Sequence, residues 1–248
     1  MDCTIKKYLK IVPGTIADYK GLARFHYRDG RTGPVAAVYK IIDTHPMREQ
    51  MEPVVGVIVY SMPACSVQLR NIATEGLFTK LGSSCANMQL VNQNIRTIAR
   101  VVIEPRYRAL GLAYELVEKT MPMLNTAYIE ALAVMGKVNP FFEKAGMMKF
   151  EGTEPMRSVK LRQALSAIGI EQTELVDIER THDRLQNLSE KAKGFIERHI
   201  TDFLAAYGRR ARTMPECLKR TEFLISRLTE RPVYYLWRNV KLNLKLKS

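Results

Sequence analysis

The stretch from Ile98 to Val117 decides the fold, and it reads IARVVIEPRYRALGLAYELV. Its apolar first part is typical of a strand covered on both faces, and Pro105 ends that strand. The turn that follows carries small residues at Ala109, Gly111 and Ala113. Small residues let a backbone approach a ligand closely, and the first amides of a helix attract anions. The stretch therefore predicts a strand, a phosphate-type turn and a helix over about 111–120.

Alternating strands and helices surround this stretch. Apolar runs predict strands over 7–12, 35–42, 53–60 and 128–134, and helical spacing predicts helices over 15–25 and from residue 140. Glycines and amides suggest loops over 61–95. Strand, turn, helix, strand and helix in this order indicate an α/β fold.

The pattern of apolar residues changes after Phe150. Apolar residues recur at helical spacing as far as Leu228, so we expect an α/β domain over 1–152 and a mainly helical, basic extension over 153–248. A short strand over 233–235 would extend either the chain's own sheet or the sheet of a partner in a homodimer.

The charge is strongly basic, with 38 Lys and Arg against 25 Asp and Glu, a net charge of +13. Such a balance favours polyanionic partners, and nucleic acid is the expected one. The four cysteines show no metal-ligand spacing, and the first residues show no apolar signal segment. No apolar run approaches the roughly 20 residues that span a bilayer. We expect no metal, no membrane and a cytoplasmic protein.

Two spaced motifs resemble the GNAT N-acetyltransferase superfamily. Arg108-Ala109-Leu110-Gly111-Leu112-Ala113 is similar to the family pattern Arg/Gln-x-x-Gly-x-Gly/Ala after a strand, although many members have Gly where Ala109 stands. Residues 139–147, NPFFEKAGM, are similar to the later family helix that often reads Phe-Tyr-Glu-Lys-x-Gly-Phe. The resemblance covers roughly residues 1–150.

The resemblance implies a mixed sheet whose central strands splay apart, flanked by helices, with acetyl-CoA or another acyl-CoA as cofactor. The residues implied to bind the cofactor lie on the strand, the turn, the helix start and the later helix: Val101, Val102, Ile103, Arg106, Arg108, Ala109, Leu110, Gly111, Leu112, Ala113 and Phe142. Many members have a Tyr where Phe142 stands, and that Tyr protonates the departing thiolate. Phe142 has no proton to give, so either another group does this work or the thiolate leaves unassisted.

The sequence defines the residues that would bind the acceptor amine less clearly than those that would bind the cofactor. His26 follows the first helix, where the family commonly places the acceptor pocket, and its ordinary pKa suits a general base. A loop histidine with a structural hydrogen bond is the alternative reading. Further candidates for the catalytic pocket are Tyr27, Tyr60, Ser61 and Asn139, the last of which is also a natural helix N-cap. Arg70 and Glu130 could touch substrate or cap turns.

A closer resemblance, carried by residues 25–28, 57–63 and 130–142, is to a branch found beside ABC-type ATPases and to the Mom-type DNA-modification proteins of bacteriophages. It implies an acyl transfer to an amine of a DNA base, which would have to be flipped out of the duplex. Arg209, Arg210 and Arg212, with Lys241, Lys245 and Lys247, would contact phosphates. The alternatives are a small-molecule or protein amine as acceptor, or an inactive module that binds nucleic acid or an ATPase.

Overall fold

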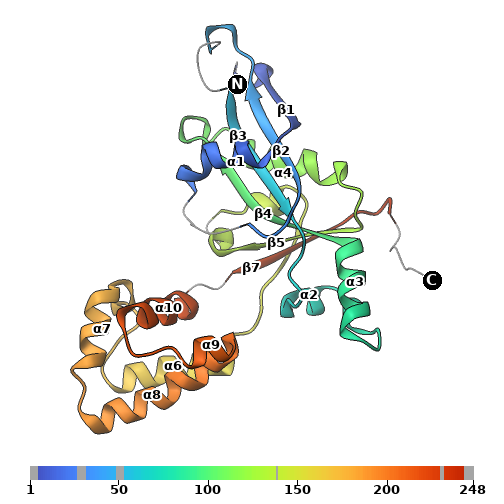
Figure 1. Cartoon of the computed structure of the whole chain (residues 1–248). Helices are drawn as coiled ribbons and strands as arrows, with labels where there is room; N and C mark the ends of the chain where they lie inside the picture. Colours follow the sequence, from blue (N-terminus) through green and yellow to red (C-terminus); the bar gives the residue numbers. More distant parts are fainter. Residues whose placement is uncertain (1–4, 27–31, 49–52, 138, 230–231, 243–248) are drawn as a thin grey trace. The chain divides into compact units, whose positions relative to one another are not determined.

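The computed structural model describes residues 5–26, 32–48, 53–137, 139–229 and 232–242. It divides into two compact units, which we describe separately (Figure 1). The sheet unit comprises Met1–Glu151 and Pro232–Ser248, and the helical unit comprises Gly152–Arg231.

In the residues that the structure describes, the sheet unit is built on seven strands in the order β1-β2-β3-β4-β5-β7-β6. Their bounds are β1 Leu9–Pro13, β2 Val35–Asp43, β3 Val54–Ser61, β4 Ile95–Ile103, β5 Tyr128–Ala133, β6 Met148–Phe150 and β7 Val233–Arg238. β4 and β5 are parallel, whereas every other neighbouring pair is antiparallel. A mixed α/β architecture was predicted, and it is confirmed at this level.

The last strand departs from the predicted domain division. β7 pairs with β5 from Tyr128↔Arg238 to Ala133↔Val233 (Figure 1). On its other edge, β7 pairs with β6. Residues 232–248 therefore belong to the sheet unit, and the helical part is an insertion between β6 and β7 rather than an extension over 153–248. The aromatic run of β7 explains this placement, because such residues favour a strand buried among neighbours. The strand at 233–235 thus extends the chain's own sheet.

The α-helices in the described part of the sheet unit are α1 Ile16–Leu22, α2 Gln68–Ala73, α3 Ser84–Asn94, α4 Leu112–Thr120 and α5 Phe141–Lys144. The prediction of loops over 61–95 was wrong, since both α2 and α3 lie there. α3 is rich in polar residues and buries little beyond Leu90 and Val91, so its amphipathic pattern is weak. Its start is nevertheless marked by Ser83, whose side chain accepts from the Ala86 amide.

Both faces of the sheet are covered, and β3 shows how. Ile58 and Tyr60 pack in the same cluster as Leu116 of α4, and Val57 and Val59 pack with Leu22 of α1 on the opposite face. Alternate side chains of a strand point to opposite faces, so burial of both faces explains the continuous apolar run of this strand.

The helical unit has a core of its own. Its helices are α6 Met156–Ala167, α7 Ile178–Gln186, α8 Glu190–Leu204, α9 Arg209–Arg212 and α10 Leu218–Thr229. α8 buries Ile196, Ile200, Phe203 and Leu204, which share one helix face, against Leu161 and Leu165 of α6 and Leu224 of α10. Across both units, none of the helices that the structure describes has the length and apolar character needed to cross a membrane.

Candidate functional site

The two parallel strands at the centre of the sheet part from each other. β4 and β5 pair from Ile95↔Tyr128 to Ile98↔Ala131 and no further, although β4 runs on to Ile103. The pairing register of β3 with β4 shifts by one residue between Val59 and Tyr60, which makes Ala99 a β-bulge in β4. This bulge directly follows Ile98, the last residue of β4 that pairs with β5. The three candidate residues Val101, Val102 and Ile103 lie on the separated part of β4. These three residues pair with β3 on one side of β4, but on the side of β5 they have no paired strand, so a ligand can use the backbone groups that point to that side.

The turn after β4 has the backbone that a close ligand approach needs. A short 3-10 helix, η5 (Pro105–Tyr107), leads into Ala109 with φ +65° and Gly111 with φ +77°. Gly111 is the N-cap of α4, so the amides of Leu112 and Ala113 are the first of that helix and have no intrahelical partner. Leu110 lies between the two left-handed residues. The helix dipole adds positive potential at this point.

Both arginines of the turn, Arg106 and Arg108, make hydrogen bonds within the protein. Arg108 donates from Nε to the Ile103 carbonyl at 3.3 Å and from Nη2 to the Phe25 carbonyl at 3.1 Å. It thereby ties the turn to β4 and to η2 (Ala23–Phe25). Arg106 donates from Nε to Glu104 Oε1 at 2.6 Å, but 62% of its side chain remains exposed. Of the two, Arg106 is better placed for an anionic ligand.

Tyr107 and Lys6 also shape this turn. The Tyr107 hydroxyl donates to Asp43 Oδ2 at 2.5 Å and is buried, so it fixes the turn to β2. Lys6, from η1 (Lys6–Tyr8), forms an ion pair of 2.5 Å with Glu115 in the first turn of α4. Its Nζ lies about 4.0 Å from where a side chain on Gly111 would begin. Lys6 lies far from the turn in sequence, so no local pattern could have indicated it.

Phe142 lies in the core instead of presenting a reactive group. It is 5% exposed and stacks on Tyr235, with 5.1 Å between the ring centroids. The Tyr235 hydroxyl donates to the Gly136 carbonyl at 3.1 Å and lies 3.2 Å from Glu143 Oε1. Burial, and then the neighbouring Glu143, raise the pKa of Tyr235 to about 12. A tyrosine that keeps its proton at neutral pH therefore lies beside Phe142, but it is fully buried and its hydroxyl is already bound by Gly136 and Glu143.

Two of the candidate catalytic residues, Tyr60 and Ser61, are buried in the sheet. Tyr60 has no exposed surface, and its hydroxyl lies 2.7 Å from Thr120 Oγ1 of α4. Burial raises the pKa of Tyr60 far above its ordinary value, and the hydrogen bond to Thr120 only partly opposes this. Ser61 is 4% exposed at the end of β3, paired with Thr97. A tyrosine at the end of an apolar strand is more often a packing residue, and here it is one.

The remaining acceptor-side candidates lie on separate elements. His26 directly follows η2, is half-buried, and donates its backbone N–H to the Ala23 carbonyl. Tyr27 lies outside the described residues. Asn139 is exposed, and Pro140 rather than Asn139 is the N-cap of α5. Both roles predicted for Asn139, capping and substrate contact, therefore lack support from a local contact.

A buried ion pair lies where the strands begin to part. Arg70 of α2 donates from Nε and Nη2 to the two carboxylate oxygens of Glu130 at 2.8 and 2.7 Å, and both side chains are 1% exposed. Glu130 also accepts from Thr97 Oγ1 and from the Tyr234 hydroxyl. Burial lowers the pKa of Arg70, but Glu130 outweighs it and the pKa is raised. These contacts hold β4, β5, β7 and α2 together.

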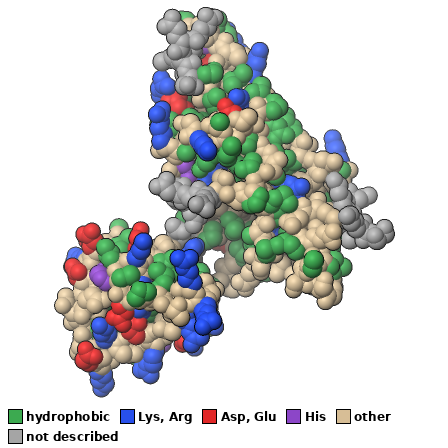
Figure 2. Space-filling model, viewed as in Figure 1, with side chains coloured by type: hydrophobic (Ala, Val, Ile, Leu, Met, Phe, Trp, Pro, Cys, Tyr) green, Lys and Arg blue, Asp and Glu red, His purple; other side chains and the backbone are tan. Residues whose placement is uncertain are grey.

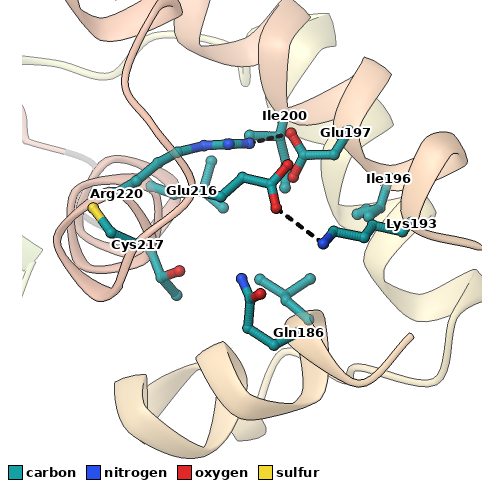
Figure 3. Close-up of a pocket in the computed structure, with 11 residues that line it drawn as sticks. Gln186, Lys193, Ile196, Glu197, Ile200, Glu216, Cys217 and Arg220 are labelled. Atoms are coloured by element: carbon teal, nitrogen blue, oxygen red, sulfur yellow. Dashed lines mark hydrogen bonds and ion pairs between the residues drawn. The ribbon is translucent and has the colours of Figure 1, made fainter. Parts of the chain in front are cut away.

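The pocket in the helical unit is filled by its own side chains. Two ion pairs line it, Lys193 with Glu216 at 3.2 Å and Arg220 with Glu197 (Figure 3). The space they leave is about 20 Å³, enough for about one water molecule. It offers no room for an organic ligand. In the part of the chain that the structure describes, no group of three or more His, Cys, Asp or Glu side chains could hold a metal ion.

Comparison with known proteins adds no further assignment. No protein-family model matches this chain, and a search of the curated proteins finds no match.

Proposed function

We propose that the protein is an acyl-CoA-dependent N-acyltransferase with the architecture of the GNAT superfamily. The observation that carries the proposal is the divergence of β4 and β5 after Ile98↔Ala131, directly before a turn with two left-handed residues at the start of α4. A gap between parallel strands beside a helix N-terminus suits a thioester with a pyrophosphate tail. The sheet order supports the same reading, as do the two motifs that resemble the family.

The residues present fit an acyl-CoA. The amides of Leu112 and Ala113, with exposed Arg106 and Lys6 nearby, would hold the pyrophosphate. The backbone of Val101–Ile103 would hydrogen-bond the pantetheine and the acyl carbonyl, and amides aimed at that oxygen stabilise the charge that develops there. The bound thioester supplies an activated acyl group. His26 is the proposed base that takes a proton from the acceptor amine.

The proposed acceptor is an amine of nucleic acid, with a DNA base as the first choice. The sheet unit contains 23 basic and 13 acidic residues, a net charge of +10, whereas the helical unit contains 15 and 12, a net charge of +3. On the visible face of the helical unit, Lys and Arg side chains alternate with Asp and Glu (Figure 2). Arg209, Arg210 and Arg212 are exposed on α9, while Lys245 and Lys247 lie outside the described residues. The charge excess thus favours phosphate contacts on the sheet unit.

Calorimetric titration with acetyl-CoA tests the cofactor assignment. We expect binding by the natural chain and a loss of at least about tenfold in affinity for Ala113→Asp, because a carboxylate there would repel the pyrophosphate. An acidic residue in the first turn stabilises a helix, so the variant should fold. Ala192→Asp, the same change in the first turn of α8, is the matched control and should bind normally. Absence of binding by the natural chain, or equal binding by both variants, would contradict the assignment.

A further inference from the structure

An exposed aromatic ring marks one surface of the helical unit. Tyr207 ends η9 (Ala205–Tyr207), the 3-10 turn that follows α8, and 41% of the residue is exposed. Its ring packs on Phe203 and Phe223, with 5.4 and 5.8 Å between the ring centroids. These contacts hold the ring in place while part of it remains in solvent. Burial of the other part raises the pKa of Tyr207, so the side chain is neutral at pH 7.

Arg227 of α10 lies over the same aromatic rings. Its guanidinium carbon is 5.5 Å from the centre of the Tyr207 ring and 5.2 Å from the centre of the Phe223 ring. The residue is exposed, and within the described ranges it forms no ion pair with an acidic side chain. Aromatic rings and guanidinium planes are the two kinds of side chain on which unpaired bases stack. Tyr207 and Arg227 together therefore offer a stacking surface for a base.

Three arginines on α9 follow this ring in the chain. Arg209, Arg210 and Arg212 are exposed, while Ala211 between them is 7% exposed. Because Arg209 comes two positions after Tyr207, their Cα atoms lie within about 7 Å of each other. None of the three forms an ion pair with an acidic side chain that the structure describes, whereas other basic side chains of the unit are paired. Such guanidinium groups are available to phosphates.

The charge of the helical unit narrows the kind of partner. With 15 basic and 12 acidic residues, the unit has a net charge of only +3, so its arginine cluster is a local feature. A duplex keeps its bases stacked on each other and would offer this surface only phosphates, which leaves Tyr207 without a role. A single strand offers phosphates together with the faces of its bases. The aromatic ring and the arginines thus fit a single strand better than a duplex.

We propose that the surface formed by Tyr207, Arg209, Arg210, Arg212 and Arg227 binds single-stranded DNA. A base stacks on Tyr207 and Arg227, and the arginines of α9 pair with neighbouring phosphates. The choice of DNA rests on the proposed function, and the inference deepens that function by naming an unpaired strand as the form in which the acceptor is bound. A base in such a strand needs no flipping out of a duplex. Binding at this surface requires no acyl-CoA.

Fluorescence anisotropy of a labelled oligothymidylate of about 12 nucleotides, with the full chain and without acyl-CoA, tests the surface. We expect binding at least about tenfold tighter than that of a duplex of the same length, because only the single strand has bases free to stack. An oligouridylate of the same length should bind no more tightly than the oligothymidylate.

Two variants of Tyr207 separate stacking from a structural role. Tyr207→Leu keeps an apolar side chain against Phe203 and Phe223 but removes the stacking ring, so it should weaken oligothymidylate binding at least about fivefold. Tyr207→Phe keeps the ring and should bind like the natural chain. Circular dichroism of both variants shows whether the helical unit is folded.

The salt dependence of binding tests the arginines. Replacing all three arginines of α9 by Gln should reduce the slope of log affinity against log salt concentration by about 2, since each phosphate contact of a single strand contributes about 0.7. The matched control makes the same change of net charge at three other exposed basic residues of the unit and should keep the slope: Arg180, Lys191 and Arg198.

The proposal is overturned if the oligothymidylate does not bind, or if the duplex binds as tightly. It is also overturned if Tyr207→Leu binds as tightly as the natural chain, or if the two triple variants have the same salt slope. Tighter binding of the oligouridylate would overturn the choice of DNA. Acetyl-CoA binding is titrated separately, so its failure would contradict the proposed function and leave these results unchanged.

Discussion

Ala109 adopts a backbone conformation that residues with a side chain normally avoid. Its φ of +65° lies in the left-handed region, as does the +77° of Gly111 two positions later. In the sequence, Ala109 is a departure from a pattern that usually has Gly there. The structure shows that the departure keeps the turn and leaves strain in it, since a left-handed alanine costs about 1–2 kcal/mol.

Ala109→Gly should therefore raise the free energy of unfolding of the sheet unit by about 0.5–1 kcal/mol, because the relief of strain exceeds the entropy that glycine adds to the unfolded chain. Gly111→Ala should lower it by a similar amount, since a Cβ there meets only Lys6 Nζ at 4.0 Å and the effect is conformational. Urea denaturation followed by fluorescence of the lone Trp237, in β7, measures both. Gly21 is a helical glycine in the same unit, so Gly21→Ala should raise the free energy of unfolding. If Ala109→Gly lowered the free energy of unfolding, Ala109 would not be strained.

At the scale of elements, the Arg70–Glu130 pair fixes the point from which β4 and β5 diverge. It joins α2 to β5, and Glu130 lies opposite Thr97 in the last but one pair of the parallel ladder. Among the described residues, Glu130 accepts hydrogen bonds from buried Arg70 of α2, half-buried Thr97 of β4 and buried Tyr234 of β7. A buried pair whose groups are fully hydrogen-bonded specifies one arrangement of its elements, even where its net contribution to stability is small.

Glu130→Gln should lower the free energy of unfolding of the sheet unit by about 3–5 kcal/mol, because it leaves the Arg70 charge buried without its counter-ion. Arg70→Met combined with Glu130→Gln should cost clearly less than the two single changes added together, since neither charge is then left alone. Urea denaturation followed by Trp237 fluorescence measures the free energy of unfolding of the natural chain, of each single variant and of the double variant. Additive losses would mean that the two side chains contribute independently of each other.

The contrast between these elements explains what could be predicted from the sequence. The strand, turn and helix over 98–120 were predictable because an apolar run, a proline and a small-residue turn are local signals. The Arg70–Glu130 pair was not, because its partners are 60 positions apart and become neighbours only through the sheet. The hydrogen bond between Tyr60 and Thr120 was not predictable for the same reason, since it depends on α4 packing over β3.

For the whole molecule, the decisive feature is that β7 returns to the sheet after the helical unit. β6 and β7 are antiparallel neighbours with Phe150 opposite Tyr234, so the two ends of the helical unit enter and leave at one hairpin. The helical unit has its own core, and the sheet unit is complete only with β7 between β5 and β6. If the helical part were a C-terminal extension, ending the chain at residue 152 would leave the sheet unit intact. Because it is an insertion, the sheet unit is kept only when residues 152–231 are removed and β7 is retained.

Replacing residues 152–231 by a glycine-containing turn of about three residues should leave a folded sheet unit, because such turns connect antiparallel strands. A chain that ends at residue 152 should fail to fold, since it loses β7 and exposes Glu130 and the edges of β5 and β6. Circular dichroism and a cooperative urea transition, with acetyl-CoA titration as a second readout, distinguish the two chains. Equal folding of both would mean that β7 is dispensable and that the predicted division at 152 describes the protein better than the observed sheet.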